Sequence, residues 1–126
     1  LEHVEDPLNL LSEIKKIGFK YIFLAVPIFG FATSFEFTNS NYYHRNLAPD
    51  HLYLFTNSTL HWIEKKIGFA REFDWYFGQD MHDIARILSY SHTGFDLNNM
   101  VELLEKMQLE IDRAKKSSEI HLLWSC

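Results

Sequence analysis

The chain has few cysteines and glycines, and each shortage excludes a class of structure. Its single cysteine is the last of its 126 residues, so no disulfide within the chain and no cysteine-based zinc site can form. Its five glycines stand at positions 18, 30, 68, 78 and 94, and no two of them make a Gly-x-Gly pair. The glycine-rich turn that brings backbone amides against the phosphates of a dinucleotide is therefore not written in this sequence.

Long runs of basic residues and of apolar residues are missing as well. Lys and Arg form no cluster, and the net charge of −5 comes from scattered acidic residues, so nucleic acid and anionic membrane surfaces are not expected as partners. The longest apolar stretch, residues 21–31, is about half of what a helix needs to cross a bilayer. We therefore expect a cytoplasmic protein with no membrane segment.

Two segments about fifty residues apart predict the same helix-to-strand unit. In the first, Asp6 caps a helix that starts at Pro7 and stops at Gly18. A continuous apolar run, residues 21–26, follows and is ended by Pro27, which is typical of a strand buried on both faces in a parallel sheet.

The second unit repeats this order. Thr56 or Asn57 caps a helix that stops at Gly68, and residues 69–77 form the next extended segment. Two successive units of this kind predict an α/β fold. We expect one domain over residues 1–126, with core αβ units in 1–77 and a helical extension with a final strand in 78–126.

The remaining segments are assigned by length and pattern. Residues 28–50 form a long, aromatic-rich connection, which we interpret as a loop or lid facing the substrate. A short helix is predicted over 80–88, and a longer one begins at Asp96. Residues 118–124 are predicted to be the last strand, at an edge of the sheet.

Three motifs in order resemble one enzyme family. They are residues 1–7 (Leu-Glu-His-Val-Glu-Asp-Pro), the apolar strand ending in Val26-Pro27, and residues 49–56 (Pro-Asp-His-Leu-Tyr-Leu-Phe-Thr) before the helix that stops at Gly68. Together they resemble the C-terminal half of a class I S-adenosylmethionine-dependent methyltransferase, of the type that acts on sugars or other small molecules. The resemblance implies a partial Rossmann-like fold whose last strand is antiparallel, without the N-terminal half that holds most of the cofactor.

The resemblance also implies roles for individual residues. Leu1, Glu2 and His3 would lie near the methionine end of S-adenosylmethionine, although Glu2 and His3 could instead brace the following helix. His51 would be the catalytic base that takes a proton from the acceptor. The alternative for His51 is a loop histidine that bonds to the backbone and holds the turn before Tyr53.

The resemblance also implies a pocket for the methyl acceptor. The residues that would line the acceptor pocket are Pro27, Phe29, Tyr42, Tyr43 and His44. Aromatic rings at such positions can also be ordinary packing. No metal site is predicted, because the seven histidines include no His-x-x-x-His spacing.

Two functions follow from these observations. The first is a fragment of a methyltransferase that transfers a methyl group from S-adenosylmethionine to a small-molecule acceptor, with little or no activity or cofactor binding by this chain alone. The alternative is a non-catalytic α/β fragment or accessory subunit. Such a chain would form a homo-oligomer through an uncovered sheet edge or pair with another chain.

Overall fold

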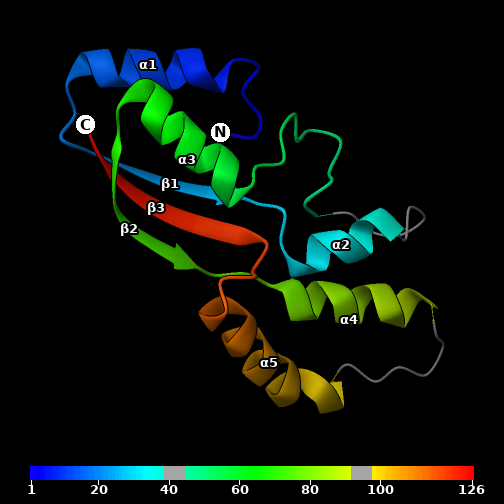
Figure 1. Cartoon of the computed structure of the whole chain (residues 1–126). Coiled ribbons are helices and arrows are strands. Elements are labelled where there is room, and N and C mark those ends of the chain that lie inside the picture. The colour runs from blue at the N-terminus through cyan, green and yellow to red at the C-terminus, as the bar shows by residue number, and fades with distance from the viewer. Residues whose placement is uncertain (39–44, 92–97) are drawn as a thin grey trace.

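The centre of the protein is a three-stranded sheet. The computed structural model describes residues 1–38, 45–91 and 98–126. Its strands are β1 (Tyr21–Pro27), β2 (Ala70–Tyr76) and β3 (Glu119–Ser125), in the order β1-β3-β2 (Figure 1). Both neighbouring pairs are antiparallel. The antiparallel last strand is thus confirmed, whereas the parallel pairing expected for β1 is wrong.

The position predicted for the last strand is also wrong, because β3 lies in the middle of the sheet. Ile120, Leu122 and Trp124 are fully buried and alternate with half-buried residues. Alternation of this kind shows that one face of a strand is buried, but it does not show how many strands flank it. In the described part of the chain β1 and β2 are the two edges.

Helices α1 (Pro7–Ile17) and α3 (Asn57–Ile67) cover one face of the sheet (Figure 1). Their ends confirm the sequence signals, because Asp6 accepts a hydrogen bond from Asn9 N at 2.9 Å and Thr56 accepts one from Thr59 N at 3.1 Å. Gly18 and Gly68 close the two helices in the left-handed conformation. The core between helices and sheet contains Leu11, Ile22, Val26, Phe55, Leu60, Ile63, Phe69, Ile120, Leu122 and Trp124.

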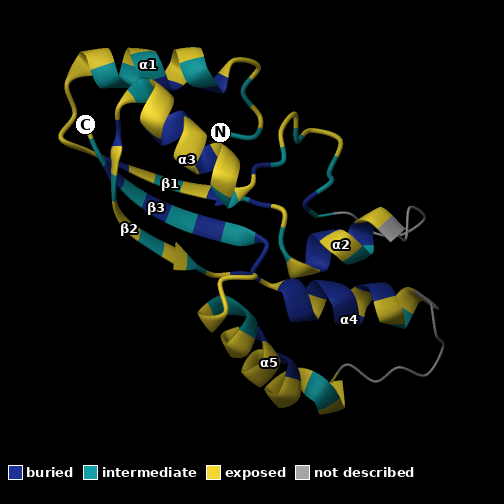
Figure 2. Cartoon of the chain, in the orientation of Figure 1, coloured by how far each residue is buried: buried dark blue, intermediate teal, exposed yellow. Residues whose placement is uncertain are grey.

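The opposite face of the sheet carries exposed rings. Figure 2 shows exposed positions along β1 and β2. In β1, Tyr21 and Phe23 are exposed while Ile22 and Val26 are buried, so the prediction of a strand buried on both faces is wrong. A continuous apolar run cannot distinguish a strand covered on both faces from one whose second face is exposed and aromatic.

A second layer lies beyond the carboxyl end of β1. It consists of α2 (Phe31–Thr38), α4 (Asp80–Ser91), the 3₁₀ turn η1 (Asn98–Met100) and α5 (Val101–Arg113). Its core is Ala32, Met81, Ile84, Ala85 and Leu104. Helix α2 falls within residues 28–50, so the prediction of a loop is wrong for that part. The cap predicted at Asp96 lies outside the described residues, and no described helix is long and apolar enough to span a membrane.

Candidate functional site

A small cavity at the carboxyl end of β1 brings together three of the residues singled out from the sequence. Its volume is about 250 Å³, and Glu2, Pro27 and His51 all line it. The other lining residues are Ala25, Arg45, Asn46 and Glu119. Residues from the chain start, from β1, from the loop before α3 and from β3 therefore meet at one point.

The imidazole of His51 is held by one of its two nitrogens. Its Nδ1 lies 2.9 Å from the carbonyl oxygen of Asn46. Since a carbonyl oxygen only accepts, Nδ1 carries the proton and the neutral ring keeps its lone pair on Nε2. The backbone contact foreseen as the alternative for His51 is therefore present, and it leaves Nε2 available for chemistry.

A buried carboxylate holds the turn that contacts His51. Glu36, on α2, is 2% exposed and accepts hydrogen bonds from Asn46 N at 3.0 Å and from Leu47 N at 2.9 Å. The side-chain amide of Asn46 also donates to it, at 2.9 Å. Asn46 is 1% exposed. The buried carboxylate of Glu36 therefore holds the residue whose carbonyl bonds to His51.

The first residues of the chain are bound to the same loop. The carbonyl oxygen of Glu2 accepts from Leu52 N at 2.8 Å and from Tyr53 N at 3.3 Å. His3 Nδ1 lies 2.9 Å from the carbonyl oxygen of Asp50, and the rings of His3 and His51 meet edge to face with centroids 4.8 Å apart. Glu2 and His3 thus brace the loop before α3, and they do so beside the candidate base.

The carboxylate of Glu2 faces both the cavity and a positive group. The ammonium of Leu1 lies 3.0 Å from Glu2 Oε2, and His3 Nε2 lies 3.6 Å from Glu2 Oε1. Burial opposes ionisation of Glu2, but hydrogen bonds from its own backbone N–H and from that ammonium outweigh the effect and lower the pKa of the carboxyl. Glu2 is therefore an anion in the wall of the cavity.

Arg45 links the cavity to the second layer. Its Nε lies 2.6 Å from Asp83 Oδ2 on α4, and its Nη1 lies 3.6 Å from Glu119 Oε2 on β3. Burial opposes the charge of the guanidinium, but the attraction of Asp83 and Glu119 raises the pKa of Arg45. Arg45 is thus paired with both carboxylates, and its buried Nη2 has no hydrogen-bond partner among the described residues.

A comparison with solved structures finds a protein of similar fold. No family model and no curated protein matches the sequence. Among solved structures, the chain is similar to a SAM-dependent methyltransferase from Archaeoglobus fulgidus. The match covers 99% of this chain and 55% of the other, with a TM-score of 0.51 and 18% sequence identity. The chain therefore has the fold of part of that methyltransferase and spans about half of its length.

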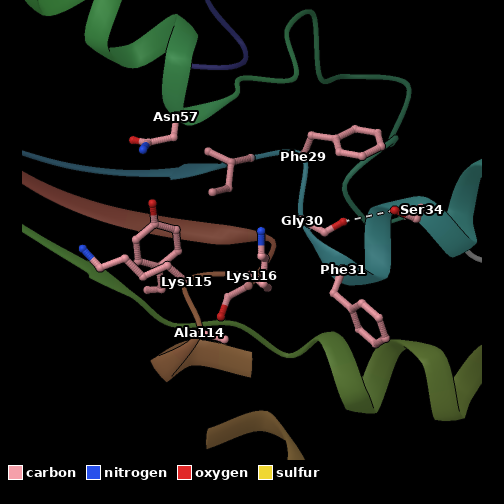
Figure 3. Close-up of a pocket in the computed structure, with 11 residues that line it drawn as sticks. Phe29, Gly30, Phe31, Ser34, Asn57, Ala114, Lys115 and Lys116 are labelled. Atoms are coloured by element: carbon pink, nitrogen blue, oxygen red, sulfur yellow. Dashed lines mark hydrogen bonds between the residues drawn. The ribbon is translucent and has the colours of Figure 1, made fainter. Parts of the chain in front are cut away.

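A larger cavity of about 710 Å³ is lined by residues that follow β1, by Asn57 and by residues 114–117 (Figure 3). Figure 3 shows Asn57 from α3 on one wall, Phe29 and Phe31 on another, and Lys115 and Lys116 on a third. Lys115 is paired with Asp74, at 2.8 Å. Phe29 lines this cavity and is separated from the group around His51, so the structure does not bring all the predicted acceptor residues together.

Some predicted site residues are not described by the structure, and some residues of the cavity were not predicted. Tyr42, Tyr43 and His44 lie outside the described residues. Arg45, Asn46 and Glu119 were not singled out from the sequence, although Arg45 and Asn46 belong to the connection that was expected to face the substrate. The signal for Glu119 was weak, since a polar residue at the start of a strand is common.

Proposed function

We propose that this chain is the C-terminal part of an S-adenosylmethionine-dependent methyltransferase that methylates a hydroxyl or amine of a small metabolite such as a sugar. The observation that carries the proposal is the shared cavity of Glu2, Pro27 and His51, whose residues come from separate parts of the sequence. The similar fold of a methyltransferase supports the same class.

His51 supplies the chemistry that this chain contributes. S-adenosylmethionine brings an already activated methyl group, so the protein has only to align the acceptor and remove its proton. The lone pair on His51 Nε2 accepts that proton. The bond from Nδ1–H to Asn46 O then stabilises the positive ring, as the partner of a catalytic histidine does.

The cofactor fits this chain only in part. The cavity of about 250 Å³ is below the roughly 300–1,000 Å³ typical of small-molecule sites, and the sequence has no Gly-x-Gly turn. Glu2, with Leu1 and His3 beside it, offers polar groups for one end of the cofactor only. We therefore expect this chain alone to bind S-adenosylmethionine weakly or not at all.

A methyl-transfer assay on a protein that joins this chain to a complete cofactor-binding half tests the proposal. His51→Ala should lower kcat by about 10²–10⁴-fold, the usual contribution of a general base. His61→Ala is the matched control, because His61 also has Nδ1 bonded, to Glu64 at 2.8 Å, but it lies on α3 and does not line the cavity. Undiminished activity of His51→Ala would remove the base assignment.

Calorimetry with S-adenosylhomocysteine tests the second part of the proposal separately. The isolated chain should show no stoichiometric binding, and the joined protein should bind one equivalent. Tight binding to the isolated chain would show that this chain alone is sufficient for the cofactor site.

The open sheet face favours a second candidate function, self-association of this chain. Phe23, Phe73 and Trp75 on that face are 55%, 65% and 43% exposed. Monomeric proteins rarely leave such a patch uncovered. Light scattering at increasing concentration distinguishes the two cases, since a chain that remains a monomer at every concentration contradicts this candidate.

A further inference from the structure

We propose that Glu2, His3 and His51 form a binding site for a divalent cation of the zinc type. Each of the three side chains offers a ligand atom, and these atoms all lie within 4.8 Å of one another. Two imidazoles and a carboxylate make a donor set typical of zinc sites that keep one position open.

Both histidines are prepared for metal binding by their other nitrogen. His3 Nδ1 bonds to the carbonyl of Asp50, and His51 Nδ1 bonds to the carbonyl of Asn46, each at 2.9 Å. In each ring the proton is therefore on Nδ1 and the lone pair on Nε2. Metal-binding histidines are held in this way, with the second nitrogen donating to a carbonyl or carboxylate.

One pair of ligand atoms already has nearly the spacing that zinc requires. In a tetrahedral site with bonds of about 2.1 Å, ligand atoms lie about 3.4 Å apart. Glu2 Oε1 and His3 Nε2 are already 3.6 Å apart. The other ligand atoms lie up to 4.8 Å apart, and the 49% exposed side chain of His3 has room to adjust toward them.

The backbone around these residues is held independently of any metal. Glu2 O accepts from Leu52 N and Tyr53 N, and the hydroxyl of Tyr53 donates to Glu5 O at 2.7 Å. These bonds join segments about fifty residues apart. The two histidines therefore come together through the fold and not through a local His-x-x-x-His motif. The cavity lined by Glu2 and His51 leaves space for a water as the fourth ligand.

Metal binding and base catalysis are mutually exclusive at His51, because both use the lone pair on Nε2. Zinc should therefore inhibit methyl transfer in a protein that carries out the proposed function. The metal site itself does not rest on that function, since binding is measured on this chain alone.

The test is a titration of the purified chain with Zn²⁺ in competition with a chromophoric chelator. One equivalent should bind, and His51→Ala and His3→Ala should each weaken binding by at least about 10-fold. His3→Ala keeps the measurement informative if His51→Ala fails to fold, because His3 is half exposed. His61→Ala, at a side chain 52% exposed, is the matched control and should bind as the unaltered chain does.

A second preparation carries extra residues ahead of Leu1, which removes the terminal ammonium that pairs with Glu2 Oε2 at 3.0 Å. Equal or tighter zinc binding by this preparation supports the three-ligand site. Three results would overturn the site: no binding, binding that survives both His3→Ala and His51→Ala, or binding that needs a free terminal amine.

Discussion

At the scale of single residues, Glu36 controls the position of the candidate base without touching it. It is the acceptor for Asn46 N, Asn46 Nδ2 and Leu47 N, and the carbonyl of Asn46 in turn bonds to His51. A carboxylate on α2 thus sets the geometry of a histidine fifteen positions later in the chain.

Replacing Glu36 with Ala should lower the free energy of unfolding by about 3 kcal/mol, because it leaves three donors without their acceptor in a buried turn. Urea denaturation measures the loss. Glu13→Ala is the control, since Glu13 is 56% exposed and its pair with Lys16 should contribute under about 1 kcal/mol. Equal losses for the two variants would show that the Glu36 contacts do not stabilise the turn.

The residues of the cavity were only partly predictable from the sequence. Glu2, Pro27 and His51 were identified through a family resemblance, and the structure places them together. Arg45 and Glu119 were not, because their pairing depends on β3 lying next to β1, a contact between residues about ninety positions apart. Neither propensity nor periodicity carries information about such a contact.

At the scale of elements, the helix ends were predictable and the strand neighbours were not. Asp6, Thr56, Gly18 and Gly68 act through their own few residues, so their effect can be read locally. Helix α2 was missed because Phe31, Phe35 and Phe37 place rings on more than one side of it. Phe35 meets Phe31 while Phe37 meets Phe29, so no single apolar stripe marks the helix.

Two glycines at element ends should respond differently to alanine. A Cβ on Gly30, between β1 and α2, would lie 2.5 Å from the backbone of Ser117 and Ser118. A Cβ on Gly18 would meet no atom within 4 Å, and only its φ of 86° opposes a side chain.

We therefore expect Gly18→Ala to cost about 1 kcal/mol from the left-handed backbone and Gly30→Ala to cost about 1–3 kcal/mol more from the clash. The urea midpoints of the two variants and the unaltered chain give the comparison. A smaller loss for Gly30→Ala than for Gly18→Ala would mean that the turn after β1 moves easily.

The ion pair between Asp74 and Lys115 joins β2 to the turn before β3, with Nζ and Oδ1 2.8 Å apart. The hydrogen bond from Lys115 is the largest cause of a lowered pKa for Asp74. Because the folded pKa lies below the unfolded value of 3.8, the stabilisation is complete above that value and is lost as the pH falls below it.

Asp74→Asn should therefore reduce stability at pH 7, and this deficit should shrink as the pH falls below 3.8 and the pair is lost in the unaltered chain. Urea midpoints at pH 7 and below pH 3.8 test this expectation. Asp50→Asn is the control, because Asp50 is 73% exposed and its carboxylate pairs, among the described residues, with His3 alone. A deficit for Asp74→Asn that is as large at low pH as at pH 7 would contradict the assignment to the ion pair.

At the scale of the whole molecule, the described residues cover only one face of the sheet. Helices α1 and α3 pack on the core face, and the opposite face carries a group of rings around His121. Phe23 and Trp75 stack there with centroids 5.6 Å apart. The chain corresponds to 55% of the methyltransferase that it resembles in fold, so a sheet left open on one face agrees with a partial fold.

That face should hold two copies of the chain together, because it is largely apolar and Glu119, an acidic residue on it, is already paired with His121 and Arg45. Trp75→Gln should raise the dimer dissociation constant by at least about 10-fold, since a central tryptophan is commonly among the most important residues of an interface. Trp62→Gln is the matched control, as Trp62 is 53% exposed on α3. Sedimentation equilibrium measures both. A chain that is monomeric throughout, or an equal effect of Trp62→Gln, would place no interface on the open face.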